Sequence, residues 1–208
     1  MIDVKLVHIT PDAEKHIAYC ARVSNPDNQD NENYVGLLNY CKKHKHWSVF
    51  EMANVCLEIN APRDISRQIL RHRSFHFQEF SQRYADASKL GFIERECRLQ
   101  DTKNRQNSIP TDDYNTNTWW ELVAREVISH NISYYQEALE EGIAKEVART
   151  LLPEGLTMSR LYMNGTVRDW IHYCEVRCGN GTQKEHILVA EKCKEILKQH
   201  LPNVFGDI

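Results

Sequence analysis

The sequence has no excess of positive charge. It contains 26 lysines and arginines against 29 aspartates and glutamates, so its 208 residues carry a net charge of −3. Proteins that bind nucleic acid usually have a basic surface, and this balance argues against that class. No apolar run approaches the length of a membrane span, and residues 1–6 lack the charged start and long apolar run of a signal peptide. We therefore expect a cytoplasmic protein that acts on neither nucleic acid nor membranes.

The sequence also lacks the patterns of a disulfide framework, a metal site and a dinucleotide-binding loop. Its seven cysteines are odd in number and scattered, which favours reduced thiols. His44 and His46 are two residues apart with no third ligand nearby, so we predict no metal site. No Gly-x-Gly-x-x-Gly occurs, so a Rossmann site for FAD or NADPH is not expected.

Hydrophobic patterning predicts strands and helices within one domain over residues 1–208. The chain is 41% hydrophobic and 26% charged, which is an ordinary globular balance. Alternation predicts strands over 4–9, 50–59, 92–99 and 156–164. Helical spacing and end signals predict helices over 10–23, 31–44, 62–71, 119–141, 145–152, 166–176 and 182–200. Thr10 is the expected N-cap of the first helix, Thr166 and Asp169 form a capping box, and residues 101–117 predict a loop.

Arginine is concentrated between residues 63 and 73, where four arginines accompany one acid. Three of them recur every fourth residue and would share one face of a helix: Arg63, Arg67 and Arg71. Arg71 and Arg73 also flank His72, so we expect these three side chains to converge from a helix end. Guanidinium groups bind phosphate and carboxylate well, and aromatic residues follow at once. We interpret the stretch as a site for an anionic, phosphorylated ligand.

A second cationic set lies further along the chain: Arg149, Arg168, His172 and Arg177. Arg168 and His172 are four residues apart and would share a helix face. Arg177 is nine residues from Arg168, about half a turn round the helix, so it points elsewhere or lies past the helix end. Two faces indicate two anionic neighbours, although a surface salt bridge is the alternative for each arginine.

These two sets resemble the motifs of the flavin-dependent thymidylate synthases. The signature of that family is Arg-His-Arg, seven residues and then Ser, here Arg71-His72-Arg73 and Ser81. Other matching positions around the signature are His46, Ser48, Phe50-Glu51, Gln68, Glu79 and Arg83. The second set matches in order and spacing, with Arg149 before Leu152-Pro153, then Arg168, His172 and Arg177. The chain departs from the pattern at Thr166, where some members have Asn, and at Gln82, where some have Gly.

The resemblance implies an α+β fold, in which helices pack against a curved, mainly antiparallel sheet. It also implies a homotetramer that holds FAD between its subunits. The reaction it implies is the reductive methylation of dUMP to dTMP. The methylene group would come from 5,10-methylenetetrahydrofolate, and the hydride from FADH2 that NADPH regenerates.

The resemblance assigns three sets of site residues. The FAD-binding positions are Ser48, Arg71, His72, Arg73, Glu79, Thr166, Arg168 and His172. The dUMP-binding positions are Gln68, Arg71, Glu79, Phe80, Ser81, Gln82, Arg83, Arg149 and Arg177. Arg177 is the catalytic position, because its charge can stabilise the anion formed when N3 of uracil ionises. Ser81 is the alternative nucleophile, but a serine needs an adjacent base, and the sequence offers none with assurance.

Two other functions use the same residues differently. A single-strand nucleic-acid binder would combine the helix over 63–73 with the aromatic residues Phe75, Phe77 and Phe80, but the acidic net charge opposes it. A zinc hydrolase would combine His44, His46, His72 and His76 with Cys174 and Cys178, and these spacings fit no common zinc site.

Overall fold

The main sheet has four antiparallel strands. The computed structural model describes residues 1–179 and 181–206, and the strand order is β1 (Asp3–Ile9), β2 (Asn54–Pro62), β6 (Met158–Thr166) and β3 (His76–Glu79). β2 and β6 pair along their whole lengths, from Asn54 opposite Thr166 to Pro62 opposite Met158. β1 and β3 form the two edges. The mixed fold with an antiparallel sheet that the resemblance implied is therefore confirmed.

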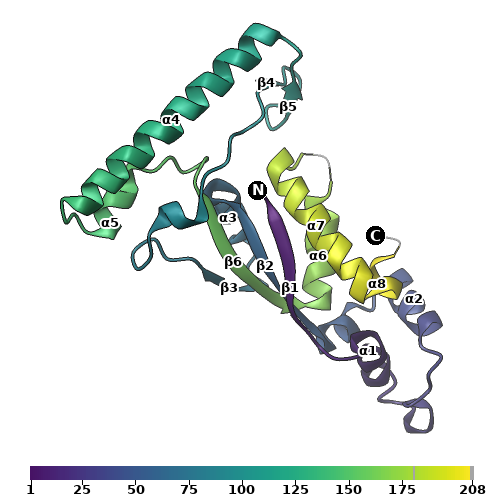
Figure 1. The fold of residues 1–208 in the computed structure, drawn as a ribbon. Helices are drawn as coiled ribbons and strands as arrows, with labels where there is room; N and C mark the ends of the chain where they lie inside the picture. The colour runs from purple at the N-terminus through teal and green to yellow at the C-terminus, as the bar shows by residue number, and fades with distance from the viewer. Residues whose placement is uncertain (180, 207–208) are drawn as a thin grey trace.

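One face of this sheet forms the core with helices α6 (Val167–Arg177) and α7 (Lys184–His200) (Figure 1). Alternate residues of β2, among them Val55 and Leu57, are fully buried. Trp170 of α6 is fully buried as well, and its Nε1 donates a hydrogen bond of 3.0 Å to the carbonyl of Val55. This packing fixes α6 against the sheet and therefore fixes the direction of its polar side chains.

The remaining helices surround the core or extend away from it. Near the core lie α1 (Ala13–Ala21), α2 (Val35–Lys43), α3 (Arg63–Ile69) and α8 (Pro202–Phe205). The long α4 (Tyr114–Glu140) reaches away from the main sheet together with the short α5 (Lys145–Ala148), and a small sheet of β4 (Arg98–Gln100) and β5 (Ser108–Pro110) lies beside it (Figure 1). In the predicted apolar stripe of α4, Tyr135 is fully buried, whereas Trp120 and Val123 are only partly buried. The predicted apolar stripe of this helix is therefore only partly covered within one chain.

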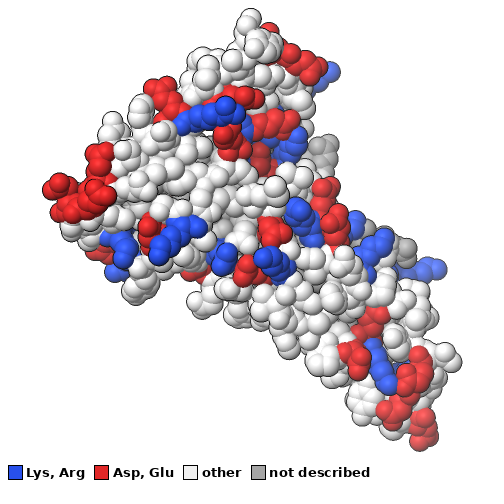
Figure 2. Space-filling view, in the orientation of Figure 1, with Lys and Arg blue, Asp and Glu red and all other residues white. Residues whose placement is uncertain are grey.

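Charged side chains are interspersed on the molecular surface. Figure 2 shows basic and acidic groups alternating on the visible face, without a continuous basic band there. Within the described residues, no helix is both long and apolar enough to cross a membrane.

Several predicted elements were wrong at the level of local detail. Thr10 does not cap α1, because its hydroxyl accepts a hydrogen bond of 2.9 Å from the backbone N–H of Asn54, and Asp12 takes the cap position without a side-chain bond. The strand expected from residue 50 begins at Asn54, after a 3₁₀ turn over Trp47–Met52. β3 was missed, because its four residues lie among the polar side chains of the signature.

The segments after the signature also differ from expectation. Within the predicted strand 92–99, Phe92 forms only an isolated bridge with Thr157, and regular pairing begins at Arg98. The predicted loop 101–117 contains β5 and the first residues of α4. In 92–99, Glu94 and Arg95 form ion pairs with Arg125 and Asp64, and Glu96 and Arg98 pair with each other. The charge pattern therefore did not reflect two faces of a sheet.

The capping box at the start of α6 is confirmed. The Thr166 hydroxyl accepts from the backbone N–H of Asp169 at 3.3 Å, and the Asp169 carboxylate accepts from the backbone N–H of Thr166 at 2.8 Å. Both bonds satisfy donors that would otherwise be unpaired at a helix start. The helix therefore begins at a defined residue, which sets the positions of Arg168, His172 and Arg177.

A substitution at Gly165 tests this packing. A Cβ at Gly165 would lie 2.5 Å from Cδ1 of the buried Phe75 ring, which packs edge-on against Trp170. Gly165→Ala should therefore lower the free energy of unfolding by about 1–3 kcal/mol, the usual cost of overpacking. Gly36→Ala is the matched control, because nothing lies within 4 Å of the added Cβ and alanine favours the helix. Urea unfolding of both variants checks this, and equal stability would contradict the described contact.

Candidate active site

One member of each cationic set meets the other where α6 ends. α3 ends at Ile69, so Arg71, His72 and Arg73 lie in the turn that leads to β3, where His72 is partly buried and the two arginines are exposed. Nε of Arg177, the last residue of α6, donates a hydrogen bond of 2.9 Å to Nε2 of His72. This contact joins positions 105 residues apart in the sequence.

His72 is held as a neutral imidazole. Because Nε of Arg177 can only donate, Nε2 of His72 must accept, which places the histidine proton on Nδ1. Burial, the Arg177 guanidinium and His172 together lower the pKa of His72 to about 4. Among the described residues Arg177 forms no ion pair with a carboxylate, so its charge is uncompensated at this point. The arrangement can stabilise negative charge on a bound molecule.

Arg168 and His172 lie on another face of α6 and line a cavity whose lining does not include Arg177 or His72. This cavity has a volume of about 450 Å³, and its lining also includes Trp47, Glu51, Ser74 and Glu175. Arg168 forms an ion pair with Glu51. The cavity thus offers an aromatic ring, a hydroxyl, a guanidinium and the N-terminal end of a helix, a set that fits a flavin nucleotide with its phosphates. A bound phosphate would compete with Glu51 for Arg168.

Trp47 and Ser74 were missed by the sequence analysis, although each is adjacent to a predicted position. Ser48 follows Trp47 in the 3₁₀ turn and is itself exposed, and Ser74 follows Arg73. Since Ser74 and Arg168 line one cavity in one chain, the signature turn and α6 of the same subunit can serve the same ligand.

Glu79 is held by neighbours that the signature did not include. Its carboxylate accepts 2.9 Å from the Ser159 hydroxyl and lies 3.8 Å from the Arg63 guanidinium. Arg63 and Arg67 both pair with Glu154, so these two arginines of the predicted basic face are already engaged within the chain. The next residue, Phe80, continues from β3 with a backbone bond to the carbonyl of Arg160.

A second group of predicted dUMP-binding residues lies beside α5. Nε of Arg83 donates 3.0 Å to the Glu146 carboxylate, and Nε of Arg149 donates 3.3 Å to the Glu146 carbonyl. The Ser81 hydroxyl accepts from the backbone N–H of Arg83 at 3.4 Å, and in the described part of the chain no base bonds to it. Gln82 is 4% exposed, and its Nε2 forms no hydrogen bond to a described residue.

The two groups of dUMP-binding positions are separated within one chain. Figure 1 shows α5, which carries the Arg83 and Arg149 contacts, on the opposite side of the sheet from α6, which carries Arg177.

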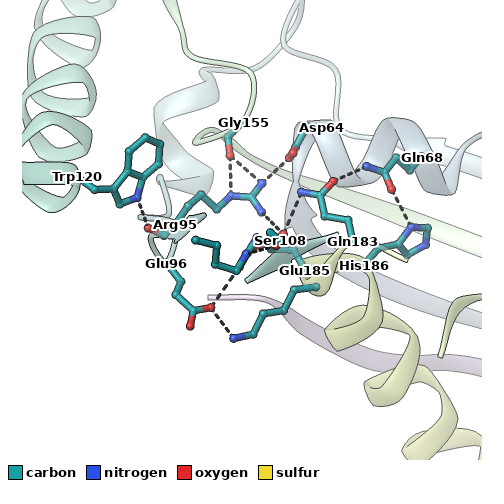
Figure 3. A network of polar contacts seen from close by, with 12 residues as sticks. Asp64, Gln68, Arg95, Glu96, Ser108, Trp120, Gly155, Gln183, Glu185 and His186 are labelled. Carbon is teal, nitrogen blue, oxygen red and sulfur yellow. Dashed lines mark hydrogen bonds and ion pairs between the residues drawn. The ribbon is translucent and has the colours of Figure 1, made fainter. Parts of the chain in front are cut away.

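A network of polar side chains that the sequence analysis missed supports Gln68 (Figure 3). Nε2 of Gln68 donates 2.8 Å to Oε1 of Gln183, and Oε1 of Gln68 lies 3.2 Å from Nδ1 of His186. Gln183 in turn donates 2.9 Å to Glu185, which pairs with Arg95 and Arg98. Apart from Gln68, these residues carry no sequence signal, because no spacing rule connects Gln183, Glu185 and His186 with their distant partners.

The comparisons with known proteins identify the family of this chain. The family described as thymidylate synthase complementing protein matches residues 5–203. A probable flavin-dependent thymidylate synthase of Paramecium bursaria Chlorella virus 1 is 52% identical over 193 residues, which are 92% of this chain and 88% of that protein. A flavin-dependent thymidylate synthase of Synechocystis sp. is 51% identical over 188 residues, 90% of this chain and 86% of that protein. The chain belongs to the flavin-dependent thymidylate synthase family.

Solved structures similar to this family member contain a nucleotide. A UMP/dUMP methylase PolB from Streptomyces cacaoi, bound with 5-Br dUMP, has a TM-score of 0.81 and 27% identity, and the match covers 99% of this chain and 93% of that chain. The same methylase bound with 5-Br UMP has a TM-score of 0.82 and 25% identity, covering 99% and 92%. The resemblance seen in the sequence motifs is therefore confirmed over almost the whole chain.

The buried histidine of the network predicts a pH dependence of stability. His186 is fully buried, and its burial, together with Arg177 and His72, lowers its pKa from 6.5 to about 3. As the pH falls below 6.5, the unfolded chain takes up this proton and the folded chain does not. The folded state should therefore lose about 2 kcal/mol from this group between pH 7 and pH 5.

Thermal unfolding of wild type and His186→Asn across this range measures the effect. The variant should show a weaker loss of stability on acidification, whereas His130→Asn, at an exposed site on α4, should follow the wild type. Parallel curves for all three proteins would mean that His186 is accessible to protons in the folded state.

Proposed function

We propose that this chain, an FAD-dependent thymidylate synthase by family, converts dUMP to dTMP by reductive methylation. 5,10-Methylenetetrahydrofolate is the carbon donor, and FAD, reduced by NADPH, supplies the hydride when bound. The observation that carries the proposal is the contact between Arg177 and neutral His72, which presents an uncompensated guanidinium beside the signature turn. The solved methylases with bound 5-Br dUMP and 5-Br UMP support a pyrimidine nucleotide as substrate.

The residues divide into three tasks. Arg177 stabilises the anion that forms when N3 of the uracil ring ionises, which enriches carbon 5 with electrons for attack on the methylene group. The residues that bind dUMP are Gln68, Arg71, Glu79, Phe80, Ser81, Gln82, Arg83 and Arg149. The residues that hold the flavin nucleotide are Ser48, Arg71, His72, Arg73, Glu79, Thr166, Arg168 and His172.

The proposed assembly is a homotetramer of single-domain subunits in the cytoplasm. The positions of Arg83 and Arg149, away from Arg177, support a dUMP site completed by a second subunit. The partly exposed stripe of α4 offers apolar surface for such contacts.

The absorption spectrum of the purified protein tests the proposal directly. FAD should co-purify or bind when added, and NADPH should bleach its absorbance. With dUMP and 5,10-methylenetetrahydrofolate present, dTMP should then form. A protein that binds FAD and dUMP but forms no dTMP from the complete mixture would refute the reaction. A colourless protein that fails to bind added FAD would refute the cofactor.

The two other functions make different predictions. A single-strand binder would purify with nucleic acid and without flavin colour. A zinc enzyme would contain stoichiometric metal, although among residues 1–179 and 181–206 no three His, Cys, Asp or Glu side chains are grouped to hold one.

A further inference from the structure

The network around Gln68 has a defined direction. Glu185 is 5% exposed, its carboxylate can only accept, and it receives hydrogen bonds from Nη2 of Arg98 at 2.6 Å and Nε2 of Gln183 at 2.9 Å. Because the Gln183 amide nitrogen must face Glu185, its oxygen faces Gln68. The Gln68 amide nitrogen therefore donates to Gln183 at 2.8 Å, and its oxygen faces His186 (Figure 3).

His186 completes the chain at its far end. The Gln68 oxygen can only accept, so Nδ1 of His186 donates to it at 3.2 Å. Neutral His186 then has a free lone pair on Nε2, which accepts from the Tyr173 hydroxyl at 3.1 Å. Every donor in this series points toward Glu185. If the Gln68 amide were reversed, its oxygen would face the oxygen of Gln183. If the Gln183 amide were then reversed as well, its oxygen would face the Glu185 carboxylate.

The fixed direction matters because Gln68 is only half-buried and keeps one N–H and one oxygen lone pair unused. At position 4 uracil presents an acceptor oxygen, whereas cytosine presents a donor amino group. N3 is left to Arg177, which stabilises the anion formed there. A carboxamide held with its N–H toward position 4 donates to uracil, and the reversed carboxamide accepts from cytosine there.

We propose that Glu185, acting through Gln183, fixes the direction of the Gln68 carboxamide, and that Gln68 thereby selects uracil over cytosine nucleotides. Glu185 and Gln183 are positioning residues, and Gln68 is the residue that contacts the base. The inference rests on the proposed function, because it takes dUMP as the ligand. A site that hydrogen-bonds a specific edge rejects the wrong base by leaving its own polar groups unpaired.

Two variants break the direction in different ways. Gln183→Met removes the acceptor for the Gln68 amide and the link to Glu185, so that the Gln68 amide and the His186 proton can reverse together. Glu185→Gln replaces the acceptor-only carboxylate by an amide that can also donate, which lets the whole series invert. Lys184→Met is the matched control, because this exposed neighbour on α7 pairs only with Glu96 among the described residues.

The measurement is the dissociation constant of the FAD-loaded enzyme for dUMP and for dCMP. Wild type and Lys184→Met should prefer dUMP strongly. Gln183→Met and Glu185→Gln should lower this preference roughly 10-fold or more, because the Gln68 carboxamide can then turn its oxygen toward position 4. FAD binding, at the separate cavity of Arg168 and His172, should be retained.

Each outcome of the binding measurement supports or overturns the inference. Unchanged preference in folded Gln183→Met, or equal weakening of both nucleotides, would overturn the inference and leave a structural role only. If Glu185→Gln fails to fold because Arg95 and Arg98 lose their partner, Gln183→Met decides alone, since its side chain is partly exposed. A wild-type enzyme that binds neither nucleotide would refute the proposed function itself.

Discussion

Replacing Arg177 by alanine should lower the rate of dTMP formation by roughly 10²–10³-fold, the usual cost of removing one preorganised donor from a developing anion. The guanidinium is held by neutral His72 and has no carboxylate partner among the described residues, so its full charge is available to the ionised uracil. FAD binding and its reduction by NADPH should persist, because the cavity of Arg168 and His172 lies elsewhere on α6. The two half-reactions are measured separately, by dTMP analysis and by flavin absorbance.

Ser81→Ala is the control for this experiment. The Ser81 hydroxyl accepts one backbone hydrogen bond, and in the described part of the chain no histidine or carboxylate is bonded to it as a base. The variant should therefore bind dUMP more weakly and still turn over. If Ser81→Ala formed no dTMP while binding dUMP, and Arg177→Ala remained nearly normal, serine would be the nucleophile and the proposed role of Arg177 would be wrong.

The arrangement of Arg168, His172 and Arg177 on α6 was predictable because it depends on local signals in the sequence. The helix period separates Arg177 from Arg168 and His172, and the structure places them at the helix end and in the cavity respectively. The capping box of Thr166 and Asp169 fixes the residue at which α6 begins, and so fixes which of its side chains share a face. The choice of His72 as partner of Arg177 is not encoded locally, and only the family motif connected the two.

The supporting network was not predictable for a related reason. Gln68 meets Gln183 across 115 residues of sequence and Arg98 meets Glu185 across 87, so no local spacing marks these pairs as polar core. The alternation of residues 92–99 gave a false strand, because Arg95 points to Asp64 and Glu185 while its charged neighbours pair elsewhere. Alternation in a sequence indicates which side chains are buried. Residues buried in ion pairs can produce the same alternation in a segment that is not part of a sheet.

Mixing two inactive variants should restore activity if the dUMP site is shared between subunits. Arg149 and Arg83 are held together by Glu146 beside α5, whereas Arg177 lies at the end of α6 on the other side of the sheet (Figure 1). In oligomers reassembled from equal amounts of Arg149→Ala and Arg177→Ala subunits, about a quarter of the sites would receive both intact arginines from different copies. Each variant alone should be nearly inactive.

The matched control mixes Arg149→Ala with Arg83→Ala. Both arginines contact Glu146 and belong to the same group, so one subunit supplies both to any given site and no mixed site is complete. Activity should return in the first mixture and not in the second, with light scattering confirming that reassembled tetramers form in both. Rescue in neither mixture of well-mixed tetramers, or a protein that is a monomer and active, would show that one chain builds the whole site. Equal rescue in both mixtures would show that Arg83 and Arg149 serve different subunits, which their shared contact with Glu146 argues against.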